Sequence, residues 1–273
     1  MKNTFDVSRR NFLKGVGVAA VAGAGATALA GCGSPSTSGS AAAEAEKTGT
    51  IPAKANMPAS IWALDEVGEP TETVEADVVI IGGGGTGMAA AIEATELGLN
   101  TVLIEKAGEL GGAFVATEGM FGVGSHWQEE AGEHGTVQEA VQRCVQYHHY
   151  IPSTKLYKNF FSQTAETIDW LEEHGCQFRA VVDYGGNLAW HVYYYDENAT
   201  SPGSYFTASL ADATKATDAQ IIMSTTVKKI LMQDGKAAGV IAEGDDGKVI
   251  QVNAPVVMIA SGGYSSNMDF LHA

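Results

Sequence analysis

Apolar and polar positions follow two different periods along this chain, and the changes of period mark the predicted elements. Residues 77–81 are a short, uninterrupted apolar run rich in β-branched side chains, which is typical of a buried strand. Four glycines follow, and residues 86–97 then carry apolar side chains at near-helical spacing, with Gly98 placed to close the helix. A second apolar run occupies residues 101–104. The pattern predicts a strand, a glycine turn, a helix and a second strand within about thirty residues.

Three later stretches have helical periodicity. Residues 136–150 and residues 153–174 each carry an apolar stripe, and both stripes are expected to face the core. A third helix is expected from about residue 205 to residue 216. The aromatic run at residues 190–195 is predicted to be a packed strand, because aromatic side chains favour strands; the alternative is the wall of a ligand cleft.

The last part of the chain is rich in short strand-like segments. Strands are predicted at residues 220–223, 226–232, 238–243, 249–252 and 256–259. The Asp-Gly pairs at residues 234–235 and 246–247 have the composition of hairpin turns. Strands that alternate with helices predict an α/β fold.

Three glycines in the first turn have the spacing G-x-G-x-x-G, and Glu105 stands where the second strand ends. Gly82 permits a tight turn, Gly84 lets backbone N–H groups approach a pyrophosphate, and Gly87 lets helix and strand pack closely. The helix N-terminus favours an anion, while Glu105 would accept both ribose hydroxyls and repel the extra phosphate of NADP. The alternative is a glycine-rich turn that only joins two core elements. The order and spacing of all the parts favour a Rossmann-like nucleotide-binding domain.

The residues after Glu105 include further glycine-rich segments that a plain NAD-binding domain does not need. Lys106 is followed by Glu-Leu-Gly-Gly at residues 109–112 and by Gly-Met-Phe-Gly at residues 119–122. With Thr226-Val227 and Ala-Ser-Gly-Gly-Tyr at residues 260–264, the chain resembles the flavoprotein subunit family of fumarate reductase and succinate dehydrogenase. Soluble relatives in that family include urocanate reductases and ketosteroid dehydrogenases. The resemblance covers about residues 76–267.

This resemblance implies FAD as the cofactor and a β-meander inserted before the last parallel strand. It places the FAD contacts at Gly82, Gly84, Gly85, Thr86, Gly87, Glu105, Lys106, Gly111, Gly112, Ala113, Phe114, Gly119, Met120, Val227, Ala260, Ser261 and Gly262. Three positions depart from the family. Ala113 stands where Asn is common, Phe114 where a small residue is usual, and Glu118 where a small or hydroxyl-bearing residue is common. These departures bear on the redox tuning of the flavin more than on its binding.

The N-terminus resembles an export signal. Ser-Arg-Arg-Asn-Phe-Leu-Lys at residues 8–14 is similar to a twin-arginine signal, and residues 16–30 are too short and too weakly apolar for a stable membrane span. Leu-Ala-Gly-Cys at residues 29–32 matches a bacterial lipobox, so lipidation is expected at Cys32. The alternative is an incidental cysteine in a signal cleaved elsewhere. The expected location is the cell envelope, after twin-arginine export, with a lipid anchor in the outer face of the cytoplasmic membrane.

Three segments are therefore expected. They are a signal peptide at residues 1–31, a flexible linker at residues 32–75, and an incomplete FAD-binding domain at residues 76–273. Because 45% of the whole chain is hydrophobic, there is ample material for one core. The net charge is −16, and nucleic acid is excluded as a partner because binding its phosphates needs clustered Lys and Arg.

Cysteines and histidines limit the redox chemistry. Cys144 and Cys176 are expected to be isolated core thiols, with a disulfide between them as the alternative. No Cys pair follows Gly112, which excludes the disulfide-reductase class of flavoproteins, and the sequence has no C-x-x-C-H haem motif and no metal-ligand spacing among its histidines. Electrons are therefore expected from another protein, such as a cytochrome or a quinol-linked protein.

The implied reaction is hydride transfer from flavin N5 to an alkene activated by a neighbouring carbonyl or carboxylate. In the family, the domain that caps the substrate and most catalytic residues follow the segment at residues 260–264, so both are expected to be absent here and no catalytic residue is assigned. Only Arg143 and Arg179 lie outside the signal, too few for a carboxylate clamp and a proton donor. The alternatives are a non-catalytic FAD-binding or electron-relay module and a degenerate remnant.

Overall fold

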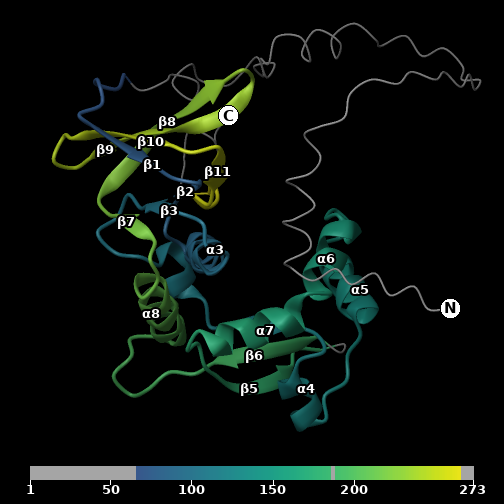
Figure 1. The fold of residues 1–273 in the computed structure, drawn as a ribbon. Coiled ribbons are helices and arrows are strands. Elements are labelled where there is room, and N and C mark those ends of the chain that lie inside the picture. Colours follow the sequence, from purple (N-terminus) through teal and green to yellow (C-terminus); the bar gives the residue numbers. More distant parts are fainter. Residues whose placement is uncertain (1–65, 186–187, 266–273) are drawn as a thin grey trace, which may run out of the picture. The chain divides into compact units, whose positions relative to one another are not determined.

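The computed structural model describes residues 66–185 and 188–265 (Figure 1). Its elements in chain order are β1 (Glu72–Glu75), β2 (Val78–Ile81), α3 (Gly85–Glu96), β3 (Thr101–Ile104), the short 3₁₀ helix η2 (Gly112–Ala116), β4 (Gly119–Gly122), α4 (His126–Ala131), α5 (Val137–Tyr147), α6 (Thr154–Phe161), α7 (Thr164–Glu173), β5 (Phe178–Asp183), β6 (Ala189–Tyr193), α8 (Pro202–Lys215), β7 (Gln220–Ile222), β8 (Thr225–Gln233), β9 (Lys236–Gly244), β10 (Val249–Asn253) and β11 (Val256–Ile259). The expected signal peptide and Cys32 lie outside these residues. None of the helices described is long and apolar enough to cross a bilayer.

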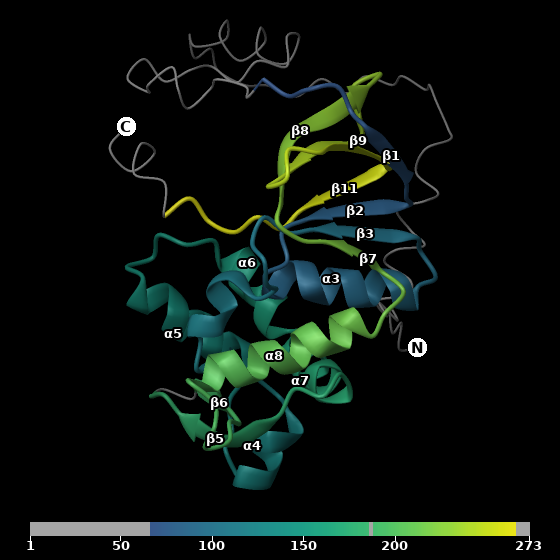
Figure 2. The same ribbon diagram turned by 90° about the vertical axis from the view of Figure 1, so that its left-hand side faces the viewer.

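A four-stranded parallel sheet organises the domain, in the order β11-β2-β3-β7. Helices α3 and α8 lie on one face of this sheet, and the sheet β1-β10-β9-β8 lies on the other (Figure 2). The inner strands β2 and β3 are therefore covered on both faces. This explains why their sequences are continuously apolar rather than alternating.

Alternate residues of the inner strands face the two neighbouring layers. Ile80 and Leu103 pack in a core with residues of α3 and α8. Val79 and Val102 pack in a second core with Val240 of β9. All five side chains have no exposed surface. The predicted strand–helix–strand unit is confirmed.

The second sheet contains a strand that was not predicted. Strands β8, β9 and β10 form an antiparallel meander, and β1 pairs in parallel with β10 along its other edge. Residues 72–75 were expected to belong to the flexible linker, but the structure places them in this sheet. The apolar pattern gave no signal, because Val74 is the one half-buried side chain of β1. Backbone hydrogen bonds hold the strand instead, including Thr71 N–H to Val249 O at 2.8 Å.

A third sheet has the order β4-β6-β5. Residues 189–193 form its central strand, so the strand predicted at residues 190–195 is confirmed for its first four residues. Tyr193 is buried and its ring stacks on Phe206 of α8, with ring centroids 3.7 Å apart. This stacking joins the third sheet to the core of the nucleotide-binding layers.

The single helix predicted at residues 153–174 is wrong, because the chain breaks at Ser162–Gln163 into α6 and α7. Phe161 of α6 packs in one core cluster and Ile168 of α7 in another. The two stripes therefore point to different neighbours, and one straight helix would not bury both. Thr164 fixes the break, since its hydroxyl accepts from Val123 N–H at 2.9 Å. The predicted stripe is also wrong in part, because Leu156 of α6 is 68% exposed.

Helix α8 begins three residues before the predicted start. Ser201 caps it, accepting from Ser204 N–H at 3.1 Å, and Pro202 is its first residue. Serine followed by proline is a helix-start signal that the hydrophobic pattern does not register.

Cys144 and Cys176 are both free and buried. The expectation of isolated core thiols is confirmed over the disulfide alternative. Burial raises the pKa of the Cys176 thiol to about 12, so this group is an unreactive core residue.

Candidate functional site

The glycine turn lies at the carboxyl end of β2, between this strand and α3. Gly82 has a φ of 103°, and a Cβ placed on it would lie 2.6 Å from the carbonyl oxygen of Ala260. A Cβ on Gly87 would overlap the carbonyl oxygen of Gly82. The turn and the close helix–strand contact predicted for these two glycines are therefore both present.

Helix α3 presents an uncapped N-terminus beside this turn. The first hydrogen bond inside the helix joins Met88 N–H to Gly84 O at 2.9 Å, so the N–H groups of Gly85, Thr86 and Gly87 have no acceptor within the helix. Gly84 at the N-cap has no side chain to cap them, and the first turn has no acidic residue. The helix end is therefore suited to an anion.

Gly84 differs from the other glycines of the turn because no described residue crowds the space beside it. The nearest atom to a Cβ on Gly84 would be Gly111 O, at 3.8 Å, which is ordinary van der Waals contact. Its φ of −75° is open to any residue. The fold itself therefore does not need glycine here, whereas a pyrophosphate on the helix end would, and the cradle fits a dinucleotide.

Glu105 follows β3 and lies next to the glycine turn, with 7% of its surface exposed. One carboxylate oxygen accepts from Gly83 N–H, and the other accepts from Ala107 N–H at 2.8 Å. The side chain thus fixes the glycine turn to the segment after β3. Each oxygen keeps a second lone pair, and the contact of Glu105 with a ribose hydroxyl stays a prediction.

The segment after Glu105 runs alongside the turn. Gly111 N–H donates to Gly83 O at 2.8 Å, and Gly111 has a φ of 134°. Phe114 in η2 covers Gly85, since a Cβ on Gly85 would lie 3.0 Å from the Phe114 ring. That ring also stands edge-on to Phe206, with centroids 6.0 Å apart. Ala113 beside it is exposed.

Two distant segments complete the edge of the site. Ala260 follows β11, and its N–H donates to Ile81 O at 2.8 Å, so Ala260 lies against Gly82. The next two residues, Ser261 and Gly262, are exposed. Thr225 N–H donates to Glu105 O at 3.0 Å. Val227 therefore lies two residues from the contact with Glu105, on β8.

Two of the expected FAD contacts have another role in the fold. Gly119 and Met120 lie on β4, opposite Val192 and His191 of β6. A Cβ on Gly119 would lie 2.7 Å from the Trp190 ring, so packing against β6 already requires this glycine. Lys106 is exposed beside the turn. Their contact with FAD stays a prediction.

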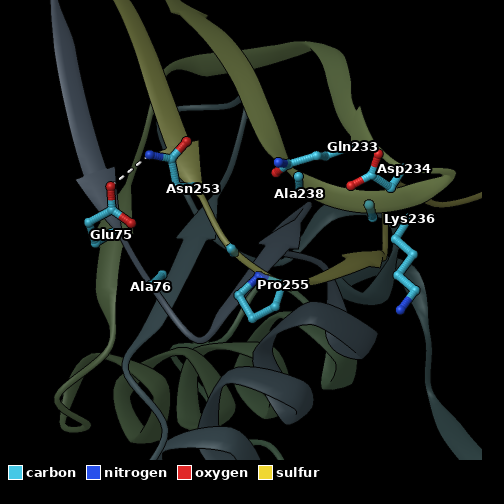
Figure 3. Close-up of a pocket in the computed structure, with 10 residues that line it drawn as sticks. Glu75, Ala76, Gln233, Asp234, Lys236, Ala238, Asn253 and Pro255 are labelled. Atoms are coloured by element: carbon cyan, nitrogen blue, oxygen red, sulfur yellow. Dashed lines mark hydrogen bonds between the residues drawn. The ribbon is translucent and has the colours of Figure 1, made fainter. Parts of the chain in front are cut away.

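A cleft of about 430 Å³ lies at the opposite end of the parallel strands from the glycine turn, beside the amino ends of β2 and β11 (Figure 3). It is lined by Glu75 and Ala76 before β2, by residues 253–255 before β11, and by the β8–β9 hairpin. Glu75 Oε1 accepts from Asn253 Nδ2 at 2.6 Å. These residues precede the parallel strands, whereas the glycine turn follows them. The cleft is therefore separate from the nucleotide cradle.

A buried polar pair between β6 and the start of α4 was not predicted. Ser125 Oγ and His191 Nε2 share a 2.6 Å hydrogen bond, and His191 has no exposed surface. Burial lowers the pKa of His191 to about 4, so the ring is neutral at pH 7. The pair is 66 residues apart in sequence, and no local pattern could have indicated it.

The geometry of the glycine turn agrees with the comparison with known families. The sequence matches the family described as FAD binding domain over residues 77–272. The chain belongs to this family. Its cofactor is FAD. The geometry of the glycine turn and Glu105 would allow these residues to hold the dinucleotide.

Several known proteins resemble this FAD-binding chain. A vinyl phenol reductase of Lactiplantibacillus plantarum is 28% identical over 71% of this chain and 39% of its own length. An NADH:fumarate oxidoreductase of Klebsiella pneumoniae is 27% identical over 79% of this chain and 23% of its own length. The structure of the open conformation of a flavocytochrome c3 fumarate reductase matches with a TM-score of 0.66 and 25% identity, over 74% of this chain and 36% of that one. The chain thus spans less than two-fifths of each relative.

Proposed function

We propose that residues 76–273 are the FAD-binding part of a reductase that adds hydride to an alkene activated by a carbonyl or carboxylate. The observation that carries the proposal is the cradle at the carboxyl ends of β2, β3 and β11, where Glu105 accepts from Gly83 N–H and Ala260 lies against Gly82. Its support is the match to an NADH:fumarate oxidoreductase and to a fumarate reductase structure.

Bound FAD supplies the hydride at N5 of its flavin. The N-terminus of α3 binds the pyrophosphate, and Glu105 accepts from the ribose while it holds Gly83 in place. Residues 111–114, which lie against Gly83 and Gly85, would extend the cradle from this end. The role of the domain is therefore to bind and orient the cofactor.

The proposal assigns substrate binding and proton donation to groups outside residues 76–273. Arg143 on α5 and Arg179 on β5 are both exposed, and Arg179 lies 5.0 Å from the Tyr195 ring centroid in a cation–π contact. Neither pairs with the other in a fork that would clamp a carboxylate. Residues 76–273 alone should therefore bind FAD and reduce alkenes slowly.

Anaerobic reoxidation of the flavin tests the function. The product of the complete gene and isolated residues 66–273, which keep β1, are each reduced with dithionite and then mixed in turn with fumarate, urocanate, a cinnamate and an enone. Flavin absorbance at about 450 nm reports oxidation. The gene product should be reoxidised by at least one alkene at about 1 s⁻¹ or faster, and the isolated domain about 10²–10⁴-fold more slowly.

Two other outcomes would contradict the proposed alkene reduction or the proposed absence of catalytic groups from the isolated domain. A gene product that no alkene reoxidises would favour the electron-relay alternative. Enzyme-like rates from isolated residues 66–273 would mean that catalytic groups lie within them.

The proposal includes a separate electron donor, such as a cytochrome or a quinol-linked protein. The sequence has neither a haem motif nor a redox-active cysteine pair, which supports delivery of electrons from another protein. The donor is tested by adding a reduced cytochrome or a quinol to the oxidised protein without oxygen. Reduction of the flavin by neither would contradict this assignment.

We also propose export by the twin-arginine route and lipidation at Cys32, which rest on the sequence alone. Replacing Arg9 and Arg10 by lysine should block export, and Cys32→Ser should leave the protein without lipid. Cells fed a radiolabelled fatty acid provide the test. Label on the Cys32→Ser protein would contradict the lipid anchor.

A further inference from the structure

Helices α4 and α7 bring together three side chains with metal-binding atoms. His126 is the first residue of α4, and Asp169 and Glu172 are three residues apart on α7. One such atom from each residue lies within 4.8 Å of the other two. His126 Nε2 is 3.5 Å from Glu172 Oε2, and His126 Nδ1 is 3.3 Å from Asp169 Oδ1. The group lies in the third-sheet region, outside the cradle.

These separations suit a shared metal ion. Zinc–nitrogen and zinc–oxygen bonds of about 2.1 Å place neighbouring ligands about 3.4 Å apart in a tetrahedral site. The His126–Glu172 separation already has this value. Asp169 has a side chain 59% exposed, so a turn about its side-chain bonds moves its carboxylate from Nδ1 towards the ion.

Buried hydrogen bonds fix where α4 stands relative to α7. Ser125, next to His126, is bound to the buried His191 at 2.6 Å. Val123 N–H donates to Thr164, the first residue of α7, at 2.9 Å. The backbone segments that carry the ligands are thus held in place before any ion binds, and the Asp169 side chain has to turn, which keeps the cost of assembling a site low.

One ligand is also oriented from outside the group. Trp127 Nε1 donates to Glu172 Oε1 at 2.9 Å. This bond leaves Oε2 turned towards His126. A hydrogen bond of this kind to a ligating carboxylate is a usual feature of metal sites.

The charges of the group favour a cation. Among the described residues, His126 is the ion-pair partner of both Asp169 and Glu172. One histidine ring carries at most one positive charge, whereas the two carboxylates carry two negative charges. Two carboxylates therefore share one imidazole ring. A divalent ion would balance both.

We propose that His126, Asp169 and Glu172 bind a divalent first-row transition-metal ion such as Zn²⁺, which ties α4 to α7. The imidazole selects against the hard ions Mg²⁺ and Ca²⁺, which take oxygen ligands. Water would complete the coordination. The site is independent of the cofactor and of the proposed reductase activity.

Cobalt and zinc titrations of the full chain, loaded with FAD and stripped of metal with a chelator, test the site at about pH 7.5. Co²⁺ reports ligation through its visible absorption, and Zn²⁺ should compete it away and raise the melting temperature. The variants Glu172→Gln, Asp169→Asn and His126→Ala each remove one ligand. His134→Ala is the matched control, because His134 is an exposed histidine outside the group.

Each ligand variant should bind Co²⁺ at least about 10-fold more weakly than the parent, and Zn²⁺ should no longer raise its melting temperature. The control should bind like the parent, and FAD content should stay the same in all variants. The proposed metal site is contradicted if any one of the three ligand variants binds Co²⁺ with the affinity of the parent. It is also contradicted if Mg²⁺ displaces Co²⁺ as effectively as Zn²⁺ does.

Discussion

The carbonyl oxygen of Gly82 occupies the space that a side chain on Gly87 would need. This contact holds the first turn of α3 against the end of β2. Gly84 lies between these two residues in sequence, and the space beside its Cα is open. Two glycines of one motif thus differ, since the fold requires glycine at position 87 but not at position 84.

Gly87→Ala and Gly84→Ala should therefore fail in different ways. The new methyl group of Gly87→Ala would meet backbone that cannot move away, so we expect the free energy of unfolding to fall by about 1–3 kcal/mol or more. Gly84→Ala should lose at most about 1 kcal/mol, the cost of alanine at an N-cap, but should lose most of its FAD. Urea unfolding of the apoprotein and the ratio of FAD to protein after purification separate the two effects. Equal FAD retention by Gly84→Ala and the parent would mean that no pyrophosphate lies beside Gly84.

Glu105→Gln should weaken both the turn and the binding of FAD. The carboxylate accepts from Gly83 N–H and Ala107 N–H, whereas a glutamine amide has one acceptor and must point its NH₂ at one of these donors. Leaving one buried N–H without an acceptor costs about 1–3 kcal/mol, which urea unfolding of the apoprotein would measure. Glu109→Gln is the matched control, because Glu109 is an exposed carboxylate nearby. If the two variants were equally stable and equally rich in FAD, Glu105 would have neither role.

The elements that could be predicted are those whose structure is determined by residues close together in the sequence. Residues 77–104 carry a buried strand, a glycine turn, an amphipathic helix and a second strand in order, so the local pattern and the final packing agree. Hairpin β8–β9 is similar, because Asp234 and Gly235 both have positive φ as an Asp-Gly turn requires. The cradle was predictable for the same reason.

The features that were missed depend on partners far away in the sequence. Strand β1 exists because β10 offers it an edge, some 178 residues later. The break between α6 and α7 follows from the contact of Thr164 with Val123, and His126 meets Asp169 across 43 residues. No periodicity within a single segment carries such information.

The contact between Gly85 and Phe114 predicts a coupled pair. A Cβ on Gly85 would lie 3.0 Å from the Phe114 ring, which Phe206 restrains from the other side. Gly85→Ala should therefore destabilise the parent by about 1–2 kcal/mol, through crowding. In a Phe114→Ala background the space is open, and the same change should be neutral or stabilising by up to about 1 kcal/mol, because alanine restricts the unfolded chain.

A double-mutant cycle of the two changes measures this coupling. We expect an interaction energy of about 1–2 kcal/mol from urea unfolding, within the range for residues in contact. Additive effects of Gly85→Ala and Phe114→Ala would mean that the ring does not press on the first residue of α3.

The buried His191 should make stability depend on pH. Its folded pKa is about 4, against about 6.5 for an exposed histidine, and burial is the main cause. Between these two values the unfolded chain takes up a proton that the folded protein excludes. Stability should therefore be fully present above about pH 6.5 and fall as the pH drops towards 4, and this one group contributes at most about 3 kcal/mol to the loss.

His191→Gln isolates this contribution, because its neutral amide can still hydrogen-bond to Ser125. The variant should be less stable than the parent at about pH 7, since it loses the packing of the ring, but the difference should shrink by about 2–3 kcal/mol at about pH 4.5. Other groups titrate in both proteins and cancel in the comparison. Urea unfolding at a series of pH values gives both curves, with His134→Gln as the control for loss of an exposed histidine. Parallel curves for the parent and His191→Gln would mean that His191 titrates alike in the folded and unfolded chains, and that the Ser125–His191 pair does not exclude the proton.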